Sequence, residues 1–193
     1  MKFSSKDRIL RNYEEVKAFV NKARHKGLKI VMTQGTFDMV HIGHGRYLEA
    51  AKSHGDVLLV GVGNDEKVRY RKGPERPVVP EEERLEMLTY LRSVDVVFCK
   101  QLGDQKWQLI KTVRPDVLIV IDENYTDEQK RDLAEYVGEV KVLDRQATTS
   151  TSAKLRFMQI GAAQKLVNTL TPRLIEVVEE SLSEIKNGAG QKK

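Results

Sequence analysis

The stretch Leu28-Lys29-Ile30-Val31-Met32, followed by Gly35-Thr36-Phe37-Asp38-Met39-Val40-His41-Ile42-Gly43-His44, decides the fold of this 193-residue chain. The first segment is short and rich in β-branched residues, which predicts a buried strand. The second segment opens a helix, in whose first turn His41 and His44 face the same side near the positive end of the helix dipole. Gly43 between them lets a bulky group approach the backbone. A helix start with two imidazole donors is suited to binding an anion.

Short strands and helices alternate along the rest of the chain. The further predicted strands are Val57–Gly61, Val94–Phe98, Val117–Ile121 and Glu139–Leu143, and the predicted helices are 7–26, Gly45–Ser53, Glu81–Leu91, Gln105–Thr112 and Asp127–Tyr136. This alternation predicts an α/β fold: a Rossmann-like open parallel five-stranded sheet with helices on both faces. Such sheets bind ligands beyond the carboxyl ends of their strands, so the site is expected in the loops that follow them.

The strand pattern stops after Ser152, where a helical extension begins. A break in this helix is expected at Pro172 and a disordered tail from Asn187. The apolar positions between Leu174 and Ile185 fit either a helix packed on its own domain or a dimerisation helix, so a homodimer is one option. The expected domains are residues 1–152, including the N-terminal helix 7–26, and residues 153–193, the C-terminal helical extension with its tail.

Composition narrows the class of protein. Lys plus Arg number 33 and Asp plus Glu 28, which gives a net charge of +5. A nucleic-acid binder usually carries a dense basic patch, and this modest total does not indicate one, so a nucleic-acid partner is not expected. The single Cys99 excludes an internal disulfide framework and a Cys-rich metal site. No segment reaches the roughly 20 apolar residues that cross a bilayer, and the first residues lack the apolar stretch of a signal peptide. A cytoplasmic protein without a membrane partner is expected.

A second candidate element is the hydroxyl-rich run Thr149-Ser150-Thr151-Ser152, which precedes the helix predicted from Ala153. Hydroxyl side chains at a helix start are by default capping residues. The functional alternative is that these hydroxyls and the free backbone amides together cradle phosphate groups. The functional hypothesis requires this turn and the histidine turn to meet around the same polyphosphate.

A third element is the basic run from Arg69 to Pro77, which contains Arg71, Lys72 and Arg76. Its Gly and Pro residues predict a mobile, positively charged loop rather than a helix face. The simpler alternative is a solvated loop without a ligand.

The two histidines, His41 and His44, could also be metal ligands, but a zinc site needs a third protein ligand and no partner spacing is evident.

The string Gly-Thr-Phe-Asp-x-x-His-x-Gly-His resembles the signature of the cytidylyltransferase-like nucleotidyltransferases, relatives of the catalytic domains of class I aminoacyl-tRNA synthetases. The resemblance covers residues 30–152. The Lys72–Pro77 stretch, which leads into Pro80-x-x-x-Arg84, is similar to that of sugar-phosphate (heptose-type) adenylyltransferases and of archaeal flavin-nucleotide-forming adenylyltransferases. The Thr149–Ser152 run is similar to the family's Ile-Ser-Thr-Thr or Ile-Ser-Thr-Ser, and Arg145 has the spacing of an arginine found in some members.

The resemblance implies a role for each matched residue. It makes His41, His44 and Lys72 catalytic, with the histidines holding the triphosphate. The residues it assigns to the nucleotide are Gly35, Thr36, Phe37, Asp38, Gly43, Arg145, Thr149, Ser150, Thr151 and Ser152. The residues it assigns to the acceptor are Asn64, Asp65, Arg71, Arg76, Asp122 and Tyr125. Asp38 is in addition a candidate ligand of Mg²⁺, the expected cofactor.

The implied activity is transfer of a nucleoside monophosphate, AMP from ATP by preference, to a sugar phosphate, with release of pyrophosphate. The alternatives are a cytidylyltransferase acting on CTP and glycerol phosphate or another phosphorylated alcohol, an FMN adenylyltransferase, and a non-catalytic nucleotide-binding module. The chain departs from its relatives after Val117–Ile121, where they carry a glycine-bearing acidic motif and this chain has Asp122-Glu123-Asn124-Tyr125. The identity of the acceptor therefore stays open.

Overall fold

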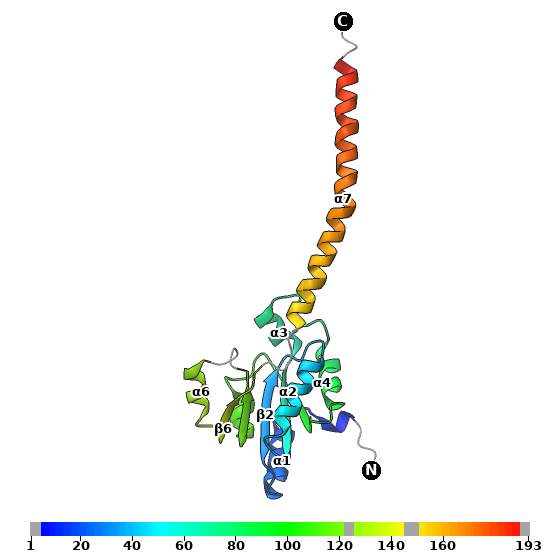
Figure 1. The fold of residues 1–193 in the computed structure, drawn as a ribbon. Coiled ribbons are helices and arrows are strands. Elements are labelled where there is room, and N and C mark those ends of the chain that lie inside the picture. Colours follow the sequence, from blue (N-terminus) through cyan, green and yellow to red (C-terminus); the bar gives the residue numbers. More distant parts are fainter. Residues whose placement is uncertain (1–4, 122–125, 145–150, 190–193) are drawn as a thin grey trace. The chain divides into compact units, whose positions relative to one another are not determined.

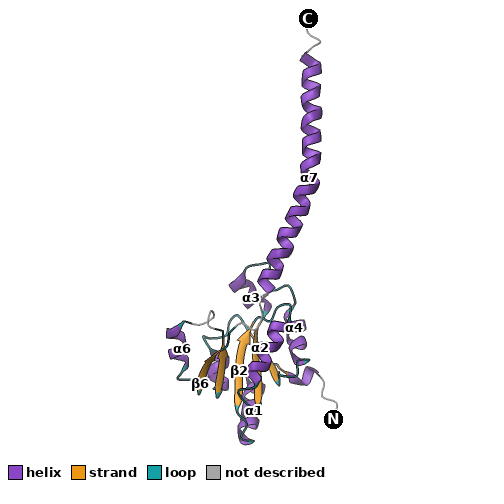
Figure 2. Cartoon of the chain, in the orientation of Figure 1, coloured by secondary structure: helices purple, strands orange, loops and turns teal. Residues whose placement is uncertain are grey.

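The computed structural model describes residues 5–121, 126–144 and 151–189 (Figure 1). It divides into two compact units, Met1–Thr148 and Thr149–Lys193. Within the described residues of the first unit, six strands form one sheet in the order β1-β4-β3-β2-β5-β6, and every pairing is parallel. Helices lie on both faces of these strands (Figure 2). The Rossmann-like α/β fold that the sequence predicts is confirmed.

The strands and helices follow the alternation seen in the sequence. The strands are β1 (Ile9–Leu10), β2 (Ile30–Gly35), β3 (Val57–Gly63), β4 (Val96–Lys100), β5 (Val117–Val120) and β6 (Glu139–Val142). The helices are η1, a 3-10 turn (Ser5–Arg8), α1 (Tyr13–His25), α2 (Ile42–Lys52), α3 (Asp65–Lys72), α4 (Glu81–Thr89), α5 (Gln108–Val113), α6 (Asp127–Leu133) and α7 (Thr151–Ala189).

Strand β2 lies at the centre and sets the place of the site. It pairs with β3 from Ile30↔Val57 to Gly35↔Val62, and with β5 on its other edge. The chain continues from β2 to β3 and β4 on one side, and later to β5 and β6 on the other. The strand order therefore reverses at β2, and ligands of such sheets bind beyond the carboxyl end of the strands at that point.

Two apolar layers hold the helices against the sheet. Helices α1, α5 and α6 contribute Val16, Val20, Leu109, Ile110, Val113 and Leu133 to the layer on one face. Helices α2 and α4 contribute Tyr47, Leu48, Ala51, Leu85 and Leu88 to the layer on the other. Side chains along the β2 strand alternate between the two layers, with Ile30 and Met32 in the first and Val31 in the second.

The helix expected at residues 7–26 begins later than predicted, and the described sheet has six strands rather than five. The helix α1 begins only at Tyr13, where the Asn12 side chain accepts the Glu15 N–H at 2.9 Å. Ile9 and Leu10 instead pair with β4 and add a sixth, two-residue strand at the edge of the sheet. An extended apolar pair gains strand hydrogen bonds there, which a frayed helical turn before the cap would not provide.

The expected mobile loop at Arg69–Pro77 is also partly wrong, because Arg69–Lys72 form the last turn of α3. The Asn64 side chain caps this helix by accepting the Lys67 N–H at 2.8 Å. Basic side chains in a last turn are favoured by the helix dipole. Gly73, with a φ of +95°, ends the helix, and only the following residues form a loop.

The second unit consists of α7 in its described part. The break expected at Pro172 is absent from the described helix, which continues through the proline to Ala189, so residues 187–189 are helical rather than disordered. Proline at an interior position removes one backbone hydrogen bond, and the long flanking segments sustain the helix across this single gap. Among the described residues, no helix combines the length and apolar character required to cross a bilayer.

Candidate active site

The histidine turn caps helix α2 with its own side chains. His41 is the N-cap residue, and its Nδ1 accepts the backbone N–H of Gly43 at 3.1 Å. The backbone N–H of His41 in turn donates to Nδ1 of His44 at 3.3 Å. Because both Nδ1 atoms accept hydrogen bonds, each neutral imidazole carries its proton on Nε2. The two Nε2–H groups are thus the donors that this turn can present to an anion.

Packing around Phe37 fixes the two rings. The imidazoles of His41 and His44 lie 4.1 Å apart between centroids, and the edge of the Phe37 ring meets His44 at 5.4 Å. Phe37 is buried and has a φ of +51°. A Cβ on Gly35 would lie 2.7 Å from Cε2 of Phe37, so only glycine leaves room for this ring. Phe37, expected to bind nucleotide, therefore packs against the ring of His44 and supports it.

Asp38 holds the segment after α3 against the histidine loop. Its carboxylate accepts the backbone N–H groups of Val78 and Val79 at 3.0–3.1 Å and pairs with Arg76 at 2.8 Å. The residue is only 2% exposed. A carboxylate surrounded by N–H donors and a guanidinium is poorly placed to bind a cation. These contacts give Asp38 a positioning role and do not fit the expected Mg²⁺ ligand.

Among the described residues, no three His, Cys, Asp or Glu side chains lie together in a group that could hold a metal ion. Nucleotidyltransferases generally use Mg²⁺ together with the triphosphate.

Arg84 connects the loops around the site through its hydrogen bonds. Its guanidinium donates to the carbonyls of Val79, Thr36 and Gly63 at 2.7–2.9 Å, and it pairs with Asp65 at 2.7 Å. The side chain is fully buried. One residue near the start of α4 thereby joins the ends of β2 and β3 to the segment before α4.

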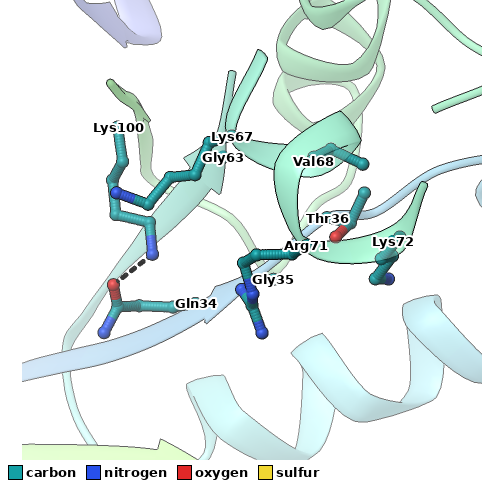
Figure 3. A pocket seen from close by; sticks show the side chains of 9 residues that line it. All are labelled: Gln34, Gly35, Thr36, Gly63, Lys67, Val68, Arg71, Lys72 and Lys100. Carbon is teal, nitrogen blue, oxygen red and sulfur yellow. Dashed lines mark hydrogen bonds between the residues drawn. The ribbon is translucent and has the colours of Figure 1, made fainter. Parts of the chain in front are cut away.

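A basic pocket opens beyond the carboxyl ends of β2, β3 and β4 (Figure 3). Its lining is Gln34, Gly35, Thr36, Gly63, Lys67, Val68, Arg71, Lys72 and Lys100. Four of these nine side chains are cationic and none is acidic. The pocket shares Gly35 and Thr36 with the loop that leads to the histidine turn, so the two features adjoin along the chain.

The cations of this basic pocket lower one another's affinity for protons. Burial, and then the charges of Lys67 and Arg71, lower the pKa of Lys100 to about 7. Partial burial and the nearby Arg76 and Arg71 also lower the pKa of Lys72. A bound anion would offset the repulsion between these cations, so the charges of the pocket favour a negatively charged ligand.

The residues assigned to the acceptor divide into two groups. Arg71 lines the basic pocket, as does the catalytic candidate Lys72. Asn64 caps α3 and donates to Gln101 at 3.0 Å, while Asp65 pairs with Arg84. Arg76 pairs with Asp38. The last three residues thus shape the site through protein contacts, and their expected contact with an acceptor stays a prediction.

Part of the expected site cannot be placed. Asp122, Tyr125, Arg145, Thr149 and Ser150 lie outside the described residues. Thr151 and Ser152 begin α7, which belongs to the second unit. The expected meeting of the hydroxyl-rich run with the histidine turn therefore stays a prediction.

Sequence reasoning missed Gln34, Lys67 and Lys100 as site residues. For Gln34 and Lys100 the reason lies in the strand ends: β2 runs to Gly35 and β4 to Lys100, two to three residues beyond the predicted ends. Lys67 lies on α3, a helix that was not predicted. Lys100 follows an apolar run directly and Gln34 precedes the glycine of the motif. A polar residue at the carboxyl end of a central strand is the signal that could have found them.

An open parallel sheet that places a histidine-capped helix start and a basic pocket beyond its central strands is typical of nucleotide-binding α/β proteins. Residues 32–183 match the family described as cytidylyltransferase-like, and the chain belongs to that family. The resemblance carried by the histidine motif is confirmed.

Curated relatives and solved structures agree with this assignment. The chain is 37% identical to the bifunctional protein HldE of Sulfurimonas denitrificans, over 79% of its own length and 32% of that protein, and 40% identical to HldE of Methylobacillus flagellatus, over 75% and 30%. It thus spans about a third of the length of these relatives. The crystal structure of a lipopolysaccharide core biosynthesis protein from Thermoplasma volcanium aligns with a TM-score of 0.53 and 29% identity, covering 61% of this chain and 98% of the other.

Proposed function

We propose that this protein is a nucleotidyltransferase that transfers AMP from ATP to a sugar phosphate and releases pyrophosphate. The observation that carries the proposal is the histidine-capped start of α2 beside the basic pocket, in a chain of the cytidylyltransferase-like family. The similarity to HldE proteins, and to a structure whose name refers to lipopolysaccharide, a glycan assembled from activated sugars, supports a sugar-phosphate acceptor.

The chemistry requires alignment and positive charge rather than a strong base. An oxygen of the acceptor phosphate, already ionised at neutral pH, forms a bond to the α-phosphorus as the bond from that phosphorus to the pyrophosphate oxygen breaks. The Nε2–H groups of His41 and His44 donate to phosphate oxygens at the start of α2. Lys72 and Arg71 bring the acceptor phosphate toward the same place. Each such contact typically contributes about 10²–10³ in rate.

The proposal is tested by measuring pyrophosphate release with ATP or CTP against a panel of sugar phosphates, phosphorylated alcohols and FMN. Turnover with ATP and a sugar phosphate is the expected result. Turnover with CTP alone would make the protein a cytidylyltransferase, and consumption of FMN with ATP a flavin-nucleotide enzyme. Nucleotide binding by calorimetry without turnover of any acceptor would indicate a non-catalytic module.

A second copy of the chain is the partner that we propose for α7. Apolar residues recur along this helix at heptad spacing, and each is exposed on the single chain: Ile160, Ala163, Val167, Leu170, Leu174 and Val177. A seven-residue apolar repeat sustained in this way is typical of helices that pair as a coiled coil.

A further inference from the structure

The cations of the basic pocket fall into two groups with Arg71 between them. Lys67 and Lys100 lie at one end of the pocket and Lys72 at the other (Figure 3). The charges that act on Lys72 include Arg76 and Asp38, which belong to the histidine side of the site. The charges that act on Lys100 include Lys67 and Asp104, and Arg71 acts on both lysines. The pocket therefore holds a cation pair that is set apart from the end where the acceptor phosphate reacts.

The contacts of Lys100 are built into the sheet. Its ammonium donates to Oε1 of Gln34 on β2, across the intervening strand β3. The residue that they span is Gly61, where a Cβ would lie 2.7 Å from Cδ2 of Leu109, 3.3 Å from Cγ of Gln34 and 3.4 Å from Cδ of Lys100. A larger residue at this position would clash with Leu109 and would also lie tightly against the bridge, so the glycine leaves room both for α5 and for Lys100 over the strand.

Lys67 is held in a similar way. Its ammonium donates to the carbonyl of Gln101 at 2.8 Å, immediately after β4. An ammonium has three N–H groups, so this single bond and that of Lys100 to Gln34 leave donors for a ligand. An acidic side chain that acts on Lys100 is Asp104, which already accepts the backbone N–H of Gln101 at 2.8 Å.

Two lysines and an arginine in one partly buried pocket repel one another without a bound anion. Burial first, and then the charges of Lys67 and Arg71, lower the pKa of Lys100, so the charged form of this side chain is costly in the folded protein. These neighbouring cations contribute little to the stability of the fold. A ligand that carries negative charge turns their repulsion into binding free energy. One acceptor phosphate accounts for the Lys72 end of the pocket, whereas Asp104 is the one acidic side chain of the described residues that acts on Lys100 at the other end, where it faces a pair of lysines.

We propose that Lys67, Lys100 and Gln34 bind a second anionic group of the acceptor, so that the preferred substrate is a sugar 1-phosphate bearing a further phosphate or carboxylate. This inference rests on the proposed function and specifies its substrate class. The first anion lies with Arg71 and Lys72 near the α-phosphorus, and the second selects the acceptor from the far end. Lys100 is then a specificity-determining residue rather than a part of the reacting centre.

The test compares acceptors that share a sugar and differ in charge: glucose 1-phosphate, glucuronic acid 1-phosphate and glucose 1,6-bisphosphate, with mannose 1-phosphate and mannose 1,6-bisphosphate as a second series. The wild-type kcat/KM is expected to be at least 10-fold higher for the acceptors with two anions. Lys100→Met and Lys67→Met are each expected to remove most of this preference through KM, while kcat and the KM for ATP stay within twofold. Lys22→Met, an exposed lysine on α1, is the matched control.

Direct binding of the same compounds, measured by calorimetry, separates this inference from the proposed function. In one outcome no acceptor releases pyrophosphate, but glucose or mannose 1,6-bisphosphate binds at least 10-fold more tightly than the monophosphate and Lys100→Met removes the difference. That outcome would support the second anion site and contradict the proposed reaction. Equal binding and turnover of acceptors with one and with two anionic groups, or an equal loss for both in Lys100→Met, would overturn the inference. The carboxylate and phosphate arms show which anion is preferred.

Discussion

The backbone N–H of His41 donates to Nδ1 of His44, so the second histidine of the motif caps the helix that the first histidine begins. The two rings therefore serve the fold through Nδ1 and the chemistry through Nε2. These two uses can be separated by substitution, because the amide oxygen of Asn lies near the position of Nδ1 and the amide nitrogen of Gln near that of Nε2.

His44→Ala is expected to reduce turnover at least 100-fold, since it removes a donor to charge that develops in the transition state. His44→Gln should retain more activity than His44→Asn, whereas His44→Asn should unfold closer to the wild-type temperature because it keeps a capping acceptor. Steady-state pyrophosphate release and thermal unfolding measure the two effects. His25→Ala, at an exposed position, serves as control. Wild-type activity in His44→Ala would refute the role given to this ring.

Arg84→Met is expected to lower the free energy of unfolding by about 3–5 kcal/mol, because it leaves the carboxylate of Asp65 and three carbonyls without their partner. Arg92 pairs with Glu49 at 2.9 Å but is 92% exposed. Arg92→Met should therefore change stability by no more than about 0.5 kcal/mol. Denaturant unfolding compares the two variants, and similar losses in both would show that Arg84 does not join the loops.

Asp38→Asn is expected to lower thermal stability and activity while leaving the Mg²⁺ concentration for half-maximal activity unchanged. The reason is that its carboxylate faces Arg76 and the N–H groups of Val78 and Val79, which a cation would have to displace. Titration of Mg²⁺ at saturating ATP distinguishes the roles. A rise of 10-fold or more in the Mg²⁺ requirement would restore Asp38 as a metal ligand.

Local features of the site could be predicted from the sequence, and its long-range contacts could not. The strand, glycine turn and histidine-capped helix of β2 and α2 involve neighbours along the chain, whose capping and dipole preferences act over a few residues. The bridge between Gln34 and Lys100 joins residues 66 apart, and Arg84 reaches Thr36 over 48. These contacts depend on the order of the strands in the sheet, which alternation alone does not specify.

Helix α3 is a local element that could not be predicted from the sequence. Its sequence is strongly polar and ends in Gly73 and Pro74, so its basic residues indicate a loop. In the structure Asn64 caps it and Val68 anchors it as the buried residue of the helix. One cap and one apolar contact suffice for a helix of this length when the sheet supplies the packing surface.

The stability of the protein is expected to rise with pH through a window set by Lys100. The pKa of its ammonium is about 7 in the folded protein and 10.5 in the unfolded chain. Below pH 7 both states are protonated, and the folded state carries the full cost of burying the ammonium together with the repulsion from Lys67 and Arg71. Between pH 7 and 10.5 the unfolded state binds more protons, so this repulsion is relieved as pH rises.

Lys100→Met should consequently unfold about 2–4 °C above the wild type at pH 6.5, the shift that roughly 1 kcal/mol produces in a chain of this size, and the difference should shrink by pH 9. Lys72, whose pKa is also lowered, is common to both proteins and cancels in the comparison. Thermal unfolding in phosphate-free buffer measures the difference. A variant that is less stable than the wild type at every pH would contradict the repulsion inferred for this pocket.

The full chain is expected to be a dimer in solution if the apolar heptads of α7 pair with a second copy. Leu170→Glu combined with Val177→Glu places charge at two positions of the apolar repeat and should yield monomers. Ala162→Glu combined with Thr169→Glu adds the same charge one position earlier in the heptad, outside the repeat, and should leave the dimer intact. Light scattering after gel filtration gives the mass of each protein. Because a coiled coil buries only the side chains of the repeat, equal masses for both double variants would show that another surface, or none, holds two copies together.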